Sequence, residues 1–207
     1  MSTVIDFVGS ISLDKLDTKT DISFYDSRFI RYMKITKRDG SSYELFYREN
    51  GTLDKKIYIH GDHTRVHELY DNGQVKRKYV KKCGLVQDEV IIYHPNGVIA
   101  QTHYEIDGVI IGPVRSFYET GELWQILEIL GGENRKVTQF YKSGAVEHTF
   151  NMLGTSREGE AVAYYENGEV AKKCMYKDDK VVSLVEFCDD EFIGMGYGDE
   201  ILKLLKR

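Results

Sequence analysis

The stretch HGDHTRVH, residues 60–67, is the part of the chain richest in side chains that could do chemistry. It holds His60, His63 and His67, three of the six histidines, together with Asp62. Imidazole and carboxylate groups are common metal ligands, and a zinc site needs about four of them at about 2 Å. Histidines four residues apart share a face of a helix, but on a strand they lie more than about 12 Å apart. The chemistry therefore depends on the element that carries this stretch.

A short pattern recurs through most of the chain. Each copy has a bulky apolar residue, a tyrosine, a short polar turn, a glycine, a variable residue and an aliphatic residue. The turn glycines, separated by 22, 24, 24, 23 and 24 residues, are Gly51, Gly73, Gly97, Gly121, Gly144 and Gly168. The tyrosines are Tyr47, Tyr70, Tyr93, Tyr118, Tyr141 and Tyr165. The residues before them, which strand alternation places on the opposite face, are Phe46, Leu69, Ile92, Phe117, Phe140 and Tyr164.

A second turn lies midway through each copy, so that two strands of about 6–8 residues and two turns fill one repeat. Glycine next to asparagine, threonine or aspartate between β-branched and aromatic residues is typical of β-hairpins. Gly61 is such a mid-repeat turn, so HGDHTRVH is a turn that leads into a strand. We therefore predict no metal site there and no cofactor. The three histidines depart from the repeat and are interpreted as solvated or as contacts to a partner.

The pattern predicts an all-β protein, an elongated single twisted antiparallel sheet of stacked β-hairpin repeats. Residues 1–39 are expected to hold a degenerate capping repeat in which Arg28 replaces the turn glycine. Six repeats are expected over residues 40–185. Residues 186–207 should form a degenerate repeat and a short C-terminal capping helix that starts at Asp199. Terminal repeats are usually atypical because they close the stack.

The repeat resembles the MORN repeat, and more closely the bacterial MORN-variant repeat of YwqK-family antitoxin-like proteins. Gly112 before Tyr118 and Gly159 before Tyr165 match an additional glycine of that family's pattern. The resemblance covers about residues 40–185. It implies a scaffold with protein or lipid contacts rather than one reaction.

Composition and motifs exclude several classes of protein. Three widely spaced cysteines argue against a disulfide framework, and a reducing compartment is the simple interpretation. We expect a cytoplasmic protein, since the start of the chain is unlike a secretory signal and no apolar run approaches about 18–20 residues. Nucleophile-elbow, zinc-protease and Walker motifs are absent from the sequence. We therefore predict no catalytic residues and no enzyme.

Charge is unevenly spread and points to a binding surface. Residues 28–82 carry 14 Lys and Arg against 7 Asp and Glu, whereas residues 83–171 carry 5 against 13. KRKYVKK, residues 76–82, is the strongest basic stretch. Alternation places Lys76 and Lys78 on one face and Arg77, Tyr79 and Lys81 on the other. The candidate anion-contact residues are Lys76, Arg77, Lys78, Lys81 and Lys82. A solvated strand whose charges prevent edge aggregation is the alternative.

These features predict a non-enzymatic protein that binds another protein through an extended aromatic and charged sheet face. The candidate face comprises the six repeat tyrosines and Trp124, although the tryptophan suits a core equally well. Neutralisation of a toxin is the role that the antitoxin-like resemblance implies. The alternative is a membrane-associated scaffold that binds anionic lipid through its basic N-terminal half. The acidic second half makes nucleic acid an unfavourable partner.

Overall fold

A computed structural model describes residues 18–184, and this part of the chain consists of strands and turns without a helix. The chain divides into two units, Met1–Leu85 and Val86–Arg207. The strands of the first unit are β1 (Lys19–Phe24), β2 (Ile30–Thr36), β3 (Ser42–Tyr47), β4 (Leu53–His60), β5 (His63–Leu69) and β6 (Val75–Lys82). The second unit holds β7 (Leu85–Tyr93, whose first residue ends the first unit), β8 (Ile99–Ile106), β9 (Val109–Phe117), β10 (Leu123–Gly131), β11 (Asn134–Phe140), β12 (Val146–Leu153), β13 (Ser156–Tyr164), β14 (Val170–Lys177) and β15 (Lys180–Leu184).

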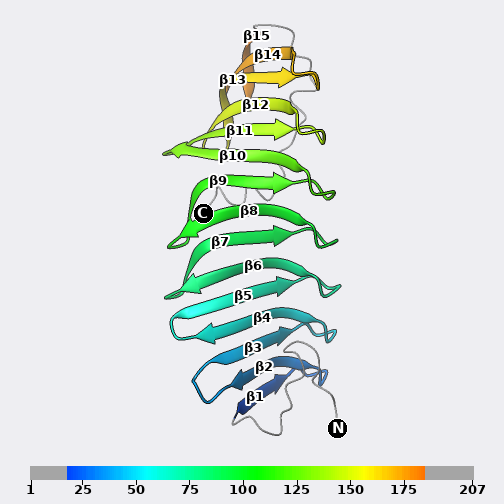
Figure 1. Cartoon of the computed structure of the whole chain (residues 1–207), viewed down its shortest axis with the longest axis vertical. Coiled ribbons are helices and arrows are strands. Elements are labelled where there is room, and N and C mark those ends of the chain that lie inside the picture. Colours follow the sequence, from blue (N-terminus) through cyan, green and yellow to red (C-terminus); the bar gives the residue numbers. More distant parts are fainter. Residues whose placement is uncertain (1–17, 185–207) are drawn as a thin grey trace. The chain divides into compact units, whose positions relative to one another are not determined.

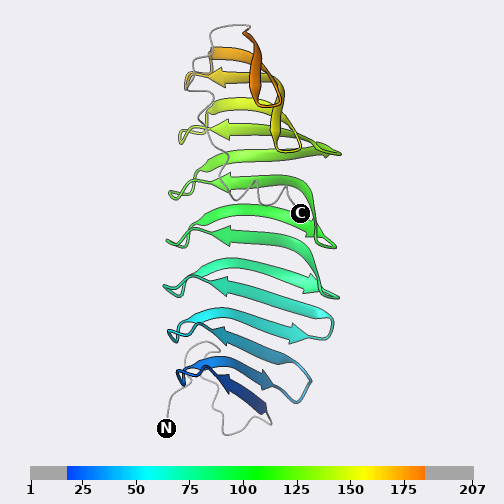
Figure 2. The same ribbon diagram turned by 180° about the vertical axis from the view of Figure 1, so that it is seen from behind.

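Within each unit every strand pairs antiparallel with the next strand along the chain (Figure 1). From β3 onward five-residue turns and two-residue turns alternate, and they lie at opposite ends of the strands; the turn between β2 and β3, residues 37–41, is also a five-residue turn. The same alternation is visible from behind (Figure 2). The prediction of an all-β hairpin fold is thus confirmed for the described residues.

The longer turns share one geometry, which explains the recurring glycine. In the turn that starts at Tyr118, the Tyr118 N–H donates to Glu122 O and the Gly121 N–H donates to Tyr118 O, both at 2.9 Å. Gly121 has φ 105°, a left-handed value that glycine adopts without steric cost. In several repeats an asparagine side chain supports the turn, as where Asn50 Oδ1 accepts the Thr52 N–H at 3.0 Å.

The first repeat keeps this geometry without glycine. The Tyr25 N–H donates to Phe29 O and the Arg28 N–H donates to Tyr25 O, both at 2.9 Å. Arg28 has φ 67°, whereas the glycines of the six later repeats lie between 82° and 105°. A regular hairpin, β1–β2, therefore precedes the six repeats expected over residues 40–185. The predicted repeat at 186–192 and the capping helix lie outside the described residues.

A bulge in β9 and in β13 accounts for the additional glycine of the pattern. Gly112 in β9 and Gly159 in β13 have φ 68° and 80°, and each lies four residues after a two-residue turn. Asp88 in β7 has the same place and φ 70°. Aspartate tolerates the left-handed region better than most residues, so this repeat keeps the left-handed backbone although its sequence lacks the glycine.

The core of the second unit lies on one face of its sheet. Alternate residues of the even-numbered strands are buried, as with Gln125 and Leu127 in β10 and Phe150 and Met152 in β12. The apolar residues of this face pack into one cluster, which comprises Val114, Leu127, Val137, Phe150, Met152, Ala161, Ala163, Cys174 and Tyr176. Burial of one side of each strand fixes the register, because a slip of one residue would expose the whole row.

Arg28→Gly should stabilise the protein. Arginine in the left-handed region costs about 1–2 kcal/mol, of which the larger unfolded-state entropy of glycine offsets a part, so we expect a gain of about 0.5–1 kcal/mol. Denaturant unfolding measures the change. In the matched control, Gly73→Ala, a Cβ would have no heavy atom within 4 Å, so only the conformational cost of about 1–2 kcal/mol should appear, as a loss. An unchanged Arg28→Gly midpoint would contradict the strain at this turn.

Candidate functional site

The six repeat tyrosines do not occupy one structural position. The prediction that they are equivalent in every repeat is wrong for two of them. Tyr47 pairs with Leu53, and Tyr93 pairs with Ile99. In other repeats the residue before the turn has this place, as where Phe117 pairs with Leu123. Tyr47 and Tyr93 therefore end their strands, and the turns that follow start at Arg48 and His94. The structural ladder is Tyr25, Arg48, Tyr70, His94, Tyr118, Tyr141 and Tyr165.

Members of this ladder tie one repeat to the next through a side-chain hydrogen bond, which we call the staple bond. Tyr118 Oη donates to Phe140 O, the carbonyl just before the next longer turn, at 2.8 Å. Tyr141 Oη donates to Tyr164 O at 2.8 Å in the same way. His94 Nε2 lies 3.0 Å from Phe117 O, so its proton must be on Nε2. In the first unit Tyr25 Oη donates to Tyr47 O at 2.7 Å.

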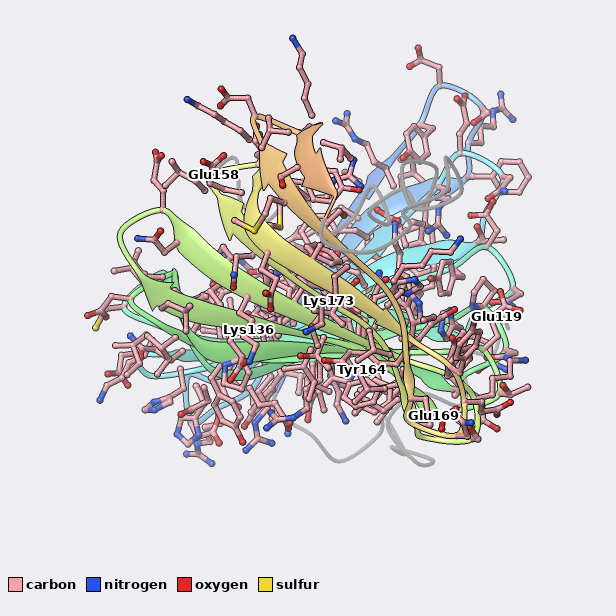
Figure 3. All side chains as sticks on the ribbon, turned by 90° about the horizontal axis from the view of Figure 1, so that it is seen from above. Glu119, Lys136, Glu158, Tyr164, Glu169 and Lys173 are labelled. Carbon is pink, nitrogen blue, oxygen red and sulfur yellow. The ribbon has the colours of Figure 1, made fainter. Side chains whose placement is uncertain are left out.

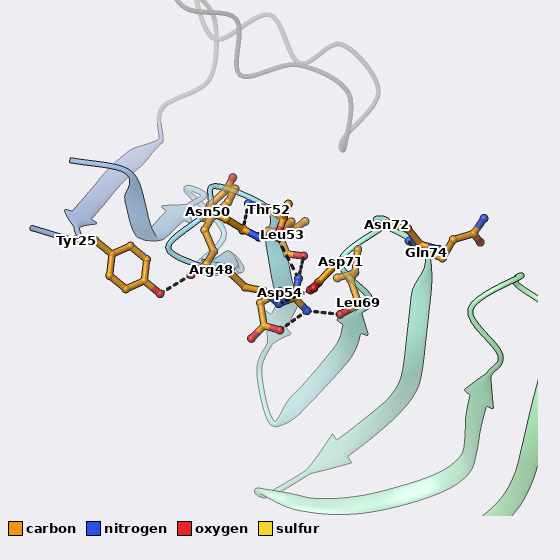
Figure 4. Close-up of polar contacts among 11 residues, drawn as sticks. Tyr25, Arg48, Asn50, Thr52, Leu53, Asp54, Leu69, Asp71, Asn72 and Gln74 are labelled. Carbon is orange, nitrogen blue, oxygen red and sulfur yellow. Dashed lines mark hydrogen bonds and ion pairs between the residues drawn. The ribbon is translucent and has the colours of Figure 1, made fainter. Parts of the chain in front are cut away.

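Arg48 makes the staple bond with a guanidinium group and adds ion pairs (Figure 4). Its Nη2 donates to Leu69 O, and its Nη1 donates to Leu53 O at 3.1 Å. Nη2 also lies 2.7 Å from Asp54 Oδ1, and Nε lies 3.0 Å from Asp71 Oδ1. The planar fork of donors suits several acceptors at once. Arginine therefore replaces tyrosine here without loss of the connection between repeats.

The staple bonds give several of the predicted face residues a structural role. The hydroxyls of Tyr118 and Tyr141 donate hydrogen bonds within the chain. The pKa of both side chains is raised, mainly by burial. Trp124 is half-buried, and its ring lies 6.4 Å from that of Tyr118. Tyr165 is more accessible, with 57% of its surface exposed. A partner-binding role for the tyrosines stays a prediction.

The basic stretch at 76–82 divides between two faces of β6. Arg77 and Lys81 lie on the side of Tyr79, with the Arg77 guanidinium 4.6 Å and Lys81 Nζ 5.9 Å from its ring centroid. Tyr79 Oη in turn donates to Glu68 at 3.2 Å. Strand alternation places Lys76, Lys78 and Lys82 on the other side. The five predicted anion-contact residues therefore do not form one patch.

The strand register brings further cations to the side that carries Lys78. His67 pairs with both Lys56 of β4 and Lys78 of β6, so the three residues form one row across the strands. Arg65 lies two residues before His67 on the same side. We call this surface the basic face, and it comprises Lys56, Arg65, His67, Lys76, Lys78 and Lys82. Sequence analysis found the stretch 76–82 and His67 separately but missed Lys56 and Arg65.

Burial and mutual repulsion both affect the titration of the basic face. Burial lowers the pKa of Lys56 to about 8. Burial also lowers the pKa of His67, and the neighbouring charges of Lys56, Lys78 and Arg65 lower it further. Like charges directly opposite each other on paired strands are destabilising. The row therefore concentrates positive charge at a cost to the fold.

The other histidines of HGDHTRVH lie at the turn, as predicted. His60 pairs with His63 across the two-residue turn, and both are exposed. His63 Nδ1 lies 2.7 Å from Asp62 Oδ1. Within residues 18–184 no three His, Cys, Asp or Glu residues are grouped so that they could hold a metal ion. The chemistry of the stretch thus depends on His67 and its cationic neighbours.

A buried polar group in the second unit escaped sequence analysis. His103 Nε2 lies 3.0 Å from Glu105 Oε1, and both side chains are almost fully buried on the core face. Gln139 Nε2 donates to Gln125 Oε1 at 3.0 Å, and Gln139 pairs with buried His148 on β12. These residues lie at every second position of their strands, on the side that carries the apolar core, and this spacing is the signal that could have revealed them. Polar letters alone suggest an exposed position.

Some acidic residues of the second unit lie near its turns, whereas others lie within strands, as Glu128 in β10 and Glu160 in β13 do. Figure 3 shows Glu119 and Glu169 at the edge with the longer turns and Glu158 toward the other edge, while Lys136 and Lys173 lie between them. Burial raises the pKa of Glu147 near the first edge.

Removal of a staple bond should destabilise the stack. Tyr118→Phe deletes only the Oη that donates to Phe140 O, and a net hydrogen bond is worth about 1 kcal/mol. We expect that loss in the free energy of unfolding from urea denaturation. Tyr104→Phe is the control, because Tyr104 lies on β8 with 50% of its surface exposed. Equal midpoints for the two variants would show that the staple bond contributes nothing.

Stability should fall in mild acid because of His148. Burial lowers the pKa of His148, so the folded protein disfavours the imidazolium form that the unfolded chain accepts. The loss begins as pH falls below the usual pKa of about 6.5 and ends below the lowered value. His148→Gln should reduce the loss between pH 7 and pH 5, since Gln101 and Gln125 hold the same position in neighbouring repeats. An identical pH dependence would refute this assignment.

Comparisons with known proteins identify one of the repeats. No curated protein matches the chain. Among solved structures it is similar to the Tc holotoxin pore of Photorhabdus luminescens, at 10% identity over 78% of this chain with a TM-score of 0.25. The match spans 12% of that chain. Residues 157–178, the hairpin β13–β14, match the family described as MORN repeat variant. This hairpin is therefore a MORN repeat variant.

Proposed function

We propose that the protein is a non-enzymatic binding protein whose basic face contacts an acidic surface of a protein partner. The observation that carries the proposal is the row Lys56, His67 and Lys78, which the strand register assembles on one side of β4–β6. Desolvated, mutually repelling cations gain more from an anionic partner than solvated cations do. MORN-variant hairpins, of which β13–β14 is one, suit such a role because stacked repeats offer extended contact surfaces.

The aromatic part of the interface is proposed to lie beside this row. Tyr58 follows Lys56 by two residues on the same side, and its ring lies 4.8 Å from that of Tyr43 on β3. Lys37 Nζ lies 4.9 Å from the centroid of Tyr43. Tyrosine is enriched at interface positions that carry much of the binding energy. We therefore propose Tyr43 and Tyr58, instead of the tyrosines that make staple bonds, as the aromatic part of the binding face.

Because the repeat resembles that of antitoxin-like proteins, we propose a toxin as the first class of partner to test. The proposed compartment is the cytoplasm. The alternative is a scaffold on anionic lipid, which the same basic face would serve. Residues 18–184 contain no helix that is long and apolar enough to cross a membrane. A contact between the basic face and anionic lipid would depend on salt.

Charge reversal on the basic face should weaken partner binding. The double variant Lys56→Glu and Lys78→Glu is expected to weaken the complex at least about tenfold, because the change removes two cations and adds repulsion. Affinity is measured by interferometry with the partner captured from cell lysate, over a series of salt concentrations. The matched control is Lys55→Glu with Lys81→Glu, which changes the same strands on the opposite side.

Equal losses in both double variants would mean that net charge, not the basic face, determines binding, and would overturn the proposal. Binding of the unmodified protein to vesicles with anionic lipid, lost in the first variant only and without a protein partner, would favour the lipid alternative. Circular dichroism must show that both variants keep their strand content, since position 56 is partly buried.

A further inference from the structure

The row at the centre of the basic face brings its two lysines within reach of one small ligand. Antiparallel neighbours lie about 4.5 or 5.5 Å apart between Cα atoms, so Lys56 and Lys78 are about 10 Å apart with His67 between them. Each lysine stem is long and flexible. Both ammonium groups can therefore approach the space above the imidazole ring at the same time. All three side chains are partly buried, whereas Arg65 and Lys76 are exposed.

The charges that surround His67 are nearly all positive. Lys56 faces it from β4, Lys78 faces it from β6, and Arg65 precedes it on β5. Lys76 lies farther along β6 on the same side. Among the described residues, two more of β4 lie on this side. Tyr58 is a phenol, and Asp54 is paired with Arg48 at 2.7 Å. A single compact anion at this point would reduce the repulsion among several cations at once.

We propose that Lys56, His67 and Lys78 form a site for one phosphate group, carried by a phosphorylated side chain of the protein partner. The inference rests on the proposed function and names the group that anchors the partner. A phosphate ester carries about −1.5 to −2 charge at neutral pH and three acceptor oxygens, so one group can meet three donors. A carboxylate has half the charge and two oxygens. Charge-assisted hydrogen bonds of this kind are about twice as strong as neutral ones.

A side chain of a protein fits the site better than a lipid headgroup does. The cations of the row are partly buried, whereas a flat membrane surface would first meet the exposed Arg65, Lys76 and Lys82. The neighbouring aromatic pair Tyr43–Tyr58 offers contact area to residues that flank a phosphorylated position. A phospholipid with an accessible phosphate monoester is the competing source, and it enters the experiment as a separate arm.

The site should couple phosphate binding to proton uptake. His67 is held toward its neutral form by burial and by its cationic neighbours, and a bound dianion reverses that preference. Binding near pH 7 therefore adds a proton to His67, and affinity should rise as pH falls from 7.5 toward about 6.5. Affinity should fall above pH 8, where Lys56 loses its charge. Below about 6 the phosphate itself gains a proton, and the increase should end.

The test uses the full chain and a model peptide with one phosphoserine, together with the same peptide carrying serine or glutamate. We expect the phosphopeptide to bind at least about tenfold more tightly than either. Lys78→Gln and His67→Gln should each remove most of that difference. Lys81→Gln, on the opposite side of β6, should leave it within about twofold. Calorimetry in buffers with different ionisation enthalpies should show proton uptake that His67→Gln abolishes.

Several outcomes would overturn the inference. Equal affinity for the phosphoserine and glutamate peptides would exclude a phosphate site. Unchanged proton uptake at pH 7 in His67→Gln would exclude His67 from the site. Binding to phosphatidylcholine vesicles that contain phosphatidic acid, without binding to the phosphopeptide, would assign the site to lipid. The proposed function fails separately, if charge reversal leaves the captured partner bound. A partner that loses binding on charge reversal but not after phosphatase treatment would sink the phosphate site alone.

Discussion

A hydrogen bond between repeats supports the stacking of the hairpins. The side chain of the first residue in a longer turn donates a hydrogen bond to the backbone carbonyl just before the next longer turn. Tyr118 donates in this way to Phe140 O, and Tyr141 donates to Tyr164 O. A two-stranded hairpin is marginal in water by itself. The strand ladders join neighbouring hairpins along their length, and the staple bond adds a contact at the turn edge. Arginine and histidine can replace tyrosine because the position requires a donor with reach rather than an aromatic ring.

Regular stacking has a second consequence, since it places equivalent residues in rows. In the second unit the rows are apolar or satisfied polar groups, such as Leu127 beside Val137 and Gln125 beside Gln139. In the first unit the same regularity aligns Lys56, His67 and Lys78, and like charges then repel across the strands. One architecture thus produces a core in one unit and a charged surface in the other.

Local requirements explain which parts of the fold could be predicted. The glycine at each longer turn has a left-handed φ, which is a property of one residue and leaves a visible letter in the sequence. Alternation within β6 correctly separated Lys76 and Lys78 from Arg77 and Lys81. The prediction was wrong where two positions accept the same letter. Tyr47 and Tyr93 precede the turn, a position that takes any bulky residue, and so they imitate the stapled tyrosines one residue later.

The sequence by itself determined the repeat, the hairpins and the position of the turns, because these depend on residues a few places apart. Only the tertiary structure decided which side chains are neighbours across the sheet. Lys56, His67 and Lys78 follow one another at intervals of 11 residues in the sequence. Their alignment in one row depends on the register of three strands. Register depends on the burial of one side of each strand and on the geometry of the turns, so no single letter encodes it. The basic face is therefore a property of the assembled sheet.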